Sequence, residues 1–205
     1  MHQEALTGKA KEILPALRNF NNFYLAGGTA LALQIGHRVS VDFDLFSEKE
    51  IDKNLFPKVR KIFYGNEITL SVNNPDELTV FIDGLKITFL KYPFSLIFDL
   101  VDCEGIGLLS VKEIAATKAY TINRRGSLKD YADIFFIVSK KHATLEEIID
   151  ISGKKYDNEF NARLFLEQLV YLEDIEEAEI EFLKESVAKK EIETFFTEEI
   201  KKIKI

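Results

Sequence analysis

The sequence predicts an α+β fold, in which a small mixed β-sheet with flanking helices is followed by a C-terminal helical bundle. The first observation behind this prediction is a run of three β signals, EITLSV, ELTVFID and LKITFL, between residues 67 and 90. Asp83-Gly84 separates two of these alternating runs, which is typical of a hairpin. The second observation is that the chain from Val111 onward has helical periodicity. The 205 residues therefore divide into two expected parts, 1–110 and 111–205.

The N-terminal part is expected to alternate helices and strands. Gly27-Gly28 ends a short apolar run, and Thr29 opens the helical sequence TALALQIG. VDFDLF alternates apolar and acidic residues, as a strand does. The expected order is a helix at 3–20, a strand at 22–26, a helix from Thr29 to Gly36, a strand at 41–46 and a helix at 50–64.

The C-terminal part is expected to be a bundle that packs against the first part and leaves a cleft between the two. The segment 91–110 shows no regular pattern. One helical face is apolar at Phe160, Leu164, Phe165, Leu169 and Leu172. The expected helices are 111–123, 129–141, 144–155, 159–173 and 177–203, the last being one helix or two.

The composition excludes several classes of protein. Cys103 is the only cysteine, which excludes a disulfide scaffold, and the three histidines lie too far apart in sequence for a zinc motif. No apolar run of about 18 residues is present, so we expect no membrane span and a cytoplasmic location. The net charge is −7, yet residues 112–141 hold seven basic and three acidic residues. This local basic stretch could bind phosphates despite the acidic whole.

The first candidate site combines Gly27-Gly28-Thr29 with Asp42 and Asp44. Residues two apart in a strand point to the same face, so the two carboxylates are expected to converge and to bind Mg²⁺. Glycines before a helix allow a triphosphate to approach free N–H groups, and Thr29 adds a hydroxyl. A turn followed by a solvated strand end is the alternative reading. Arg38 could contact a phosphate or pair with Asp42.

The second candidate site surrounds the connection between two predicted helices. Ser127 is a plausible N-cap, and Asp130 and Asp133 share one face of the helix that follows it. Lys118 on the preceding helix could face Asp133 and bind nucleotide phosphates, while the carboxylate positions a second substrate. The alternative is an interhelical salt bridge with an acidic first turn.

Both blocks carry a family resemblance. LAGGTALALQIGHRVSVDFDLF and, about seventy residues on, IAATKAYTINRRGSLKDYADIFFIV resemble minimal nucleotidyltransferases of the DNA-polymerase-β-like superfamily, and within it the AbiEii/AbiGii toxin family. The resemblance implies a nucleotidyltransferase core at 1–110, a helical domain at 111–205 that completes the active-site cleft, Mg²⁺ as cofactor and an NTP as substrate. The implied acceptor is RNA or tRNA, and the implied partner is a cognate antitoxin protein. The implied site residues are Asp42, Asp44, Lys118, Asp130 and Asp133 as catalytic residues, the first two as metal ligands, with Gly27, Gly28, Thr29, Arg125 and Lys129 binding the nucleotide.

One departure from the superfamily pattern leaves alternatives open. Many members carry a third carboxylate on the strand after the hairpin, where this chain has Thr88. Asp83, Asp130 or Asp133 could substitute, or catalysis could proceed without that base. The chain could also be a catalytically weakened nucleotide-binding module that acts through protein interactions, or a nucleotidyltransferase of the antibiotic-modifying type.

Overall fold

The computed structural model describes residues 1–203, which divide into two compact units. The first unit contains Met1–Ser95 and Asp99–Leu109. The second contains Leu96–Phe98 and the chain from Ser110 on. The expected cleft between the two units stays a prediction. None of the helices in the described residues is long and apolar enough to cross a membrane.

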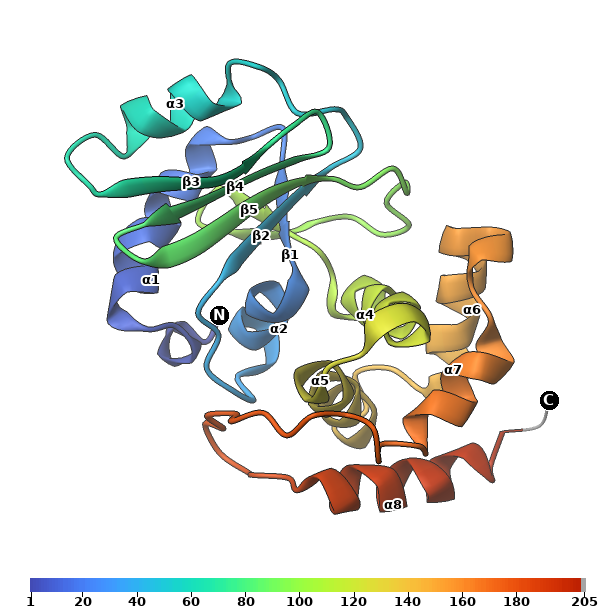
Figure 1. Ribbon diagram of the computed structural model, residues 1–205. Helices are drawn as coiled ribbons and strands as arrows, with labels where there is room; N and C mark the ends of the chain where they lie inside the picture. The colour runs from blue at the N-terminus through green and yellow to red at the C-terminus, as the bar shows by residue number, and fades with distance from the viewer. Residues whose placement is uncertain (204–205) are drawn as a thin grey trace. The chain divides into compact units, whose positions relative to one another are not determined.

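Within residues 1–203, the strands of the first unit form one mixed sheet of seven strands in the order β3-β4-β5-β2-β1-β7-β6 (Figure 1). The central strand β2 is parallel to β5 and antiparallel to β1, and β1 is parallel to β7. The predicted α+β class is therefore confirmed. The strands are β1 (Tyr24–Ala26), β2 (Phe43–Ser47), β3 (Ile68–Asn73), β4 (Glu77–Ile82), β5 (Leu85–Lys91), β6 (Val101–Cys103) and β7 (Ile106–Leu108).

The alternation of side chains separates the two faces of the sheet. Phe43 and Leu45 on β2 are buried on one face, together with Ile87 and Phe89 on β5. Phe20 packs against Phe89 with ring centroids 4.9 Å apart, so the segment before β1 covers this face. Because successive side chains point to opposite faces, Asp44 points to the other face.

The helical elements of the first unit are shorter than the sequence predicts. The expected helix at 3–20 is three elements, because Pro15 interrupts the backbone hydrogen bonding and the middle of the segment turns from α into 3₁₀ geometry. The expected helix at 50–64 begins only at Leu55, and the segment 91–110 contains β6 and β7. These elements are η1 (Gln3–Ala5), α1 (Gly8–Ile13), η2 (Leu14–Asn19), α2 (Gly27–Ile35) and α3 (Leu55–Ile62).

The second unit is helical, and side-chain caps fix where several helices begin. Ser110 Oγ accepts the Glu113 N–H at the start of α4, and Thr144 with Glu147 forms a capping box at the start of α6. Asn161 caps α7 in the same way. The helices are α4 (Val111–Arg125), α5 (Leu128–Ser139), α6 (Leu145–Tyr156), η3 (Asp157–Glu159), α7 (Ala162–Leu169) and α8 (Lys189–Ile200).

Two expectations about the C-terminal part are wrong. Regular helix within the expected range 177–203 is confined to α8, because the segment before it is strongly acidic and has few buried side chains. Leu164 does not belong to the buried face, since it is 38% exposed, whereas Phe165, Leu169 and Leu172 are buried.

A buried carboxylate ties the segment Leu96–Phe98 to the helices. Glu113 is fully buried, and its carboxylate accepts the backbone N–H groups of Ile97 (3.1 Å) and Phe98 (3.2 Å). Lys155 Nζ lies 2.6 Å from the same carboxylate, and neither side chain is exposed. The Glu113 carboxylate therefore orders a stretch of chain far from it in sequence.

Candidate active site

The N-terminus of α2 forms the first part of the site. Gly27 begins the helix directly after β1, so the helix starts two residues earlier than expected. Ala26 at the N-cap has no side-chain oxygen, so the N-cap residue itself does not cap the first-turn N–H groups. Such a helix start favours anions through these N–H groups and the helix dipole.

Asp44 lies directly against this helix start. Gly27 has a φ of +65°, and a Cβ added to it would lie 2.5 Å from Asp44 Oδ2. A Cβ on Gly28 would lie 2.3 Å from Nη2 of Arg38, which is 4% exposed. The presence of glycine at both positions therefore has a physical reason, because a carboxylate and a guanidinium occupy the space that a side chain would need.

Asp42 precedes β2 and is exposed, while Asp44 is half-buried within the strand. The Asp42 carboxylate makes no hydrogen bond or ion pair with any residue in the described part of the chain. The suggested pair between Arg38 and Asp42 is therefore absent from residues 1–203. An unpartnered carboxylate two residues from a second one is open to bind a cation.

Thr29 is buried and hydrogen-bonded within the protein, and its assignment to nucleotide binding stays a prediction. It is 2% exposed, and its hydroxyl is hydrogen-bonded to Ser40 Oγ at 2.7 Å and to the Asp42 carbonyl oxygen. These contacts attach the start of α2 to the segment that leads into β2. The hydroxyl thus holds the glycine turn and the acidic strand together, rather than standing open toward a phosphate.

The glycine turn allows a prediction about stability. Gly27→Ala is expected to cost at least about 1–2 kcal/mol, because an L side chain in the left-handed region is strained and its Cβ would displace the Asp44 carboxylate. Gly153→Ala is the matched control, since Gly153 lies inside α6 with no atom within 4 Å of an added Cβ. The control is expected to gain up to about 1 kcal/mol from helix propensity. Urea unfolding of both variants checks the prediction, and equal effects would contradict it.

Thr88 lies beside Asp44 in the sheet. β2 and β5 are parallel with Asp44 opposite Thr88, and Thr79 on β4 is opposite Thr88 on its other side. The hydroxyls of Thr79 and Thr88 are 3.3 Å apart, and the Thr79 hydroxyl donates to Glu77 Oε1 at 2.6 Å. A chain of hydroxyls therefore occupies the position of the third carboxylate.

A hollow of about 300 Å³ adjoins Asp42 within the first unit and also contains Lys9 and Asp83. Asp83, a candidate to replace the third carboxylate, accepts hydrogen bonds from the Asn66 amide (2.7 Å) and the Glu67 N–H (2.8 Å). These bonds, with the nearby Lys9 ammonium, lower the pKa of Asp83. Asp83 is therefore a weaker proton acceptor than an ordinary aspartate and serves the turn before β5.

Lys86 is a residue that the sequence analysis missed. It lies two positions before Thr88 on β5, so it points to the same face as Thr88 and Asp44, and it is exposed. The signal that could have found it is the alternation of LKITFL, once Thr88 is aligned with Asp44. Its ammonium adds a positive charge to this face of the sheet.

The donor set suits magnesium. Asp42 and Asp44 offer hard carboxylate oxygens two residues apart, and the lack of a side chain at Gly27 lets the Asp44 carboxylate lie against the start of α2. Mg²⁺ is often bound by one or two carboxylates together with substrate phosphates, which a helix N-terminus also attracts. These two residues therefore fit the metal as the residues that would hold it.

The second unit contains the predicted lysine and its acidic partners. Lys118 Nζ on α4 lies 2.6 Å from Asp130 Oδ1 and 2.9 Å from Asp133 Oδ2 on α5. Lys118 is 8% exposed and Asp133 is fully buried. The expected approach of Lys118 to Asp133 is therefore present.

The other predicted residues of this unit differ in their surroundings. Asp130 forms a capping box, since its Oδ2 accepts from both the N–H (3.0 Å) and the hydroxyl (2.8 Å) of Ser127. With Lys118 on its other oxygen, this carboxylate is suited to position groups rather than to accept a proton. Arg125 and Lys129 flank the connection between α4 and α5 and are exposed. Their assignment to nucleotide binding stays a prediction.

The stability of this unit is predicted to depend on pH through the buried phenol of Tyr131. It is 2% exposed, and burial, with a smaller contribution from the Asp130 charge, raises its pKa to about 12. The unfolded chain would ionise this phenol near pH 10, so its contribution to stability is present below pH 10 and is lost between about pH 10 and 12. The loss is expected to be at most about 3 kcal/mol. Urea unfolding across this range should show a shallower fall for Tyr131→Phe, and an identical fall would contradict the prediction.

Solved structures of other proteins share this fold. MenT4, the nucleotidyltransferase toxin Rv2826c of Mycobacterium tuberculosis H37Rv, is similar with a TM-score of 0.60 and 18% identity, over 93% of this chain and 80% of that one. JHP933 from Helicobacter pylori is similar with a TM-score of 0.52 and 17% identity, over 80% of this chain and 90% of that one. The fold is thus a nucleotidyltransferase fold.

The family follows from the sequence. The model of the AbiEii family, described as "Nucleotidyl transferase AbiEii toxin, Type IV TA system", matches residues 11–204. The chain therefore belongs to the AbiEii family of nucleotidyltransferases, as the resemblance implied. An uncharacterized protein of Aquifex aeolicus (strain VF5) is 34% identical over 195 residues, which covers 94% of this chain and 93% of that protein.

Proposed function

We propose that this chain transfers a nucleoside monophosphate from an NTP to a hydroxyl of an RNA acceptor, with tRNA as the first candidate. The acceptor oxygen forms a bond to the α-phosphorus, the bond from that phosphorus to the β-phosphate oxygen breaks, and pyrophosphate leaves. The observation that carries the proposal is the contact of Gly27 with Asp44, which brings an anion-binding helix start to a carboxylate.

The residues of the first unit have separate roles in this proposal. Asp42 and Asp44 hold Mg²⁺, which when bound activates the attacking hydroxyl and neutralises charge on the departing phosphate. Gly27 and Gly28 allow the triphosphate to reach the N–H groups of α2, and Thr29 fixes this turn through Ser40 and Asp42. Arg38 adds its positive charge beside Gly28.

The residues of the second unit form a further part of the proposal. Lys118 would neutralise phosphate charge, Asp133 would position or deprotonate the acceptor hydroxyl, and Asp130 would orient Lys118. Arg125 and Lys129 would contact the nucleotide. The description of the AbiEii family names a toxin of a type IV toxin–antitoxin system. We therefore also propose that a cognate antitoxin is a partner of this chain and that the chain acts in the cytoplasm.

The test is label transfer by the full chain. The protein is incubated with Mg²⁺, each of four α-labelled NTPs, total tRNA and cell lysate, with EDTA in a parallel reaction. A labelled tRNA band that disappears with EDTA supports the proposal and identifies the preferred nucleotide. Label on a protein, or on an aminoglycoside added in a separate reaction, with none on RNA, would keep the reaction and replace the acceptor.

A second candidate rests on Thr88. Threonine cannot act as a base near neutral pH, and Asp83 has a lowered pKa. A nucleotide-binding module that acts through a protein partner is therefore the alternative. Tight binding of Mg²⁺ and NTP without label on any acceptor would favour it, and restored transfer in Thr88→Asp would attribute the weakness to this position.

A further inference from the structure

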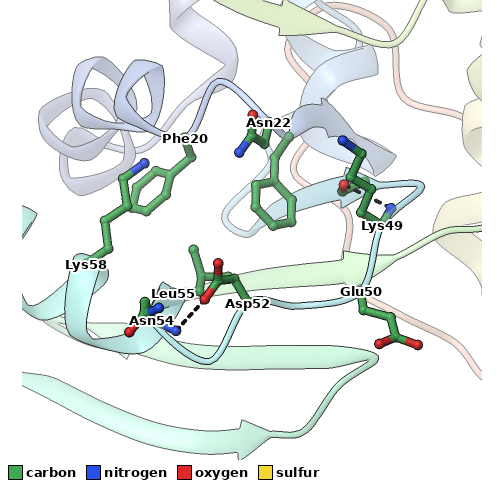
Figure 2. A pocket seen from close by; sticks show the side chains of 10 residues that line it. Phe20, Asn22, Lys49, Glu50, Asp52, Asn54, Leu55 and Lys58 are labelled. Carbon is green, nitrogen blue, oxygen red and sulfur yellow. Dashed lines mark hydrogen bonds between the residues drawn. The ribbon is translucent and has the colours of Figure 1, made fainter.

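A second pocket in the first unit lies away from the carboxylates (Figure 2). It has a volume of about 320 Å³ and lies at the end of β2, with residues from the loop before β1, the loop after β2 and the start of α3. Ser47 belongs to this pocket, and it shares the buried face of β2 with Phe43 and Leu45. The pocket is therefore on the opposite face of the strand from Asp44.

The wall of this pocket is aromatic. Phe20 and half-buried Phe23 both line it, and both rings pack against Phe89. Figure 2 shows Lys58 beside the Phe20 ring, and the Lys58 ammonium is 5.2 Å from the ring centroid. An aromatic ring at the edge of a pocket can stack against a planar ligand such as a nucleic-acid base. This stacking does not depend on which base is bound.

Three polar side chains at the rim of the pocket have no hydrogen-bonding or ion-pair partner among the described residues. The side-chain amides of Asn22 and Asn54 and the ammonium of Lys49 make no hydrogen bond or ion pair within residues 1–203. The two acidic side chains at the rim, by contrast, already have partners within the protein. Glu50 pairs with Lys91 at 3.1 Å, and Asp52 Oδ1 accepts the Asn54 N–H at 2.7 Å.

The surface next to the pocket is basic and unpaired. The segment KNLFPKVRK, residues 53–61, contains four cations and no acid, and all four are exposed. Among the described residues, none of these four or Lys49 forms an ion pair. By contrast, Lys190 on α8 and Lys201 directly after it pair with acids three residues away. A row of unpaired cations on a chain of net charge −7 favours a polyanion.

We propose that this pocket binds one nucleotide of a single-stranded RNA, and that α3 with the loop before it binds the adjacent phosphates. The base stacks at Phe23, the amides of Asn22 and Asn54 meet its edge, and Lys49 and Lys58 bind phosphates. The volume matches the lower end of small-ligand pockets, about 300 Å³, which accommodates one nucleotide. The inference rests on the proposed function, because it assigns a second contact to the same RNA acceptor.

Binding is measured by fluorescence anisotropy of a labelled single-stranded RNA of about 12 nucleotides. EDTA is present, so that the Mg²⁺-dependent site does not contribute. The full chain is titrated between about 50 and 400 mM KCl, because each phosphate contact adds about 0.7 to the slope of log affinity against log salt. Lys49→Gln/Lys58→Gln is expected to lower this slope by about 1.4 and to weaken binding roughly 25-fold near 0.1 M salt.

Two further variants separate charge from stacking. Lys11→Gln/Lys184→Gln removes the same charge from two other exposed, unpaired lysines and is expected to leave the slope unchanged. Phe23→Leu keeps apolar volume and removes the ring, so it should weaken binding about 5- to 100-fold with the slope unchanged. Urea unfolding confirms that each variant is folded. Equal slopes for the two lysine pairs would overturn the proposal.

The remaining arms identify the source of the nucleotide and separate this inference from the proposed function. If AMP, CMP, GMP or UMP binds the wild type as tightly as RNA does, and Phe23→Leu abolishes that binding, the ligand is a free mononucleotide. If neither RNA nor mononucleotides bind, the pocket is not a nucleotide site, and an acidic protein segment becomes its candidate. Asp44→Asn should still bind RNA in EDTA, because Asp44 lies outside this pocket. A variant that binds RNA but no longer transfers label would therefore report on the carboxylates and not on the pocket.

Discussion

Asp44→Asn is expected to lower nucleotidyl transfer at least 100-fold while the protein stays folded. The amide keeps the size of the side chain but removes the negative charge that faces the α2 helix start. Loss of residues that only support metal ligands costs about 10- to 100-fold, so loss of a direct ligand should cost at least as much. Initial rates of label transfer at saturating NTP and at several Mg²⁺ concentrations measure the effect.

Asp99→Asn is the matched control for this experiment. Asp99 is exposed in the same unit, and its side chain makes no hydrogen bond or ion pair with another described residue. Its variant should retain the wild-type rate at every Mg²⁺ concentration. Transfer by Asp44→Asn at the rate of this control would remove Asp44 from the proposed metal site.

Glu113→Ala is expected to destabilise the protein by about 3–5 kcal/mol. The substitution removes the carboxylate from the fully buried Lys155 and the acceptor from two backbone N–H groups, those of Ile97 and Phe98. Removing one partner of a buried ion pair is much more costly than removing both. Urea unfolding followed by circular dichroism measures the loss of free energy.

The double variant Glu113→Leu/Lys155→Met provides the comparison. It replaces both charges with apolar groups of similar size and should recover part of the stability lost in Glu113→Ala. The recovery should be incomplete, because the N–H groups of Ile97 and Phe98 still lack an acceptor. A double variant less stable than Glu113→Ala would contradict this account.

The sheet and the first half of the site were largely predictable. Alternation and turn residues are local signals, so β3, β4 and β5 could be read from EITLSV, ELTVFID and LKITFL. The pairing of Thr88 with Asp44 was not predicted, because the sequence does not show which strands are neighbours in the sheet. The strand at VDFDLF was also found, although β2 begins after Asp42.

Features that depend on distant contacts could not be predicted in this way. The buried hydroxyl of Thr29 depends on Ser40, which the sequence separates from it by a helix. The capping box of Asp130 was visible in its spacing from Ser127, yet the simultaneous pairing with Lys118 required the packing of α4 against α5. The role of Glu113 had no local signal, because its partners lie 15 and 16 residues before it and 42 residues after it.

The short segment Leu96–Phe98 has a consequence for how this protein can be divided. Because it belongs with the helices while its flanking residues belong with the sheet, the chain crosses from one unit to the other three times. A fragment that ends at Leu109 carries the segment without Glu113, and a fragment that starts at Ser110 carries Glu113 without the segment. No single cut therefore yields two self-sufficient modules. We therefore expect the sheet unit and the helical unit to be expressed together as one chain.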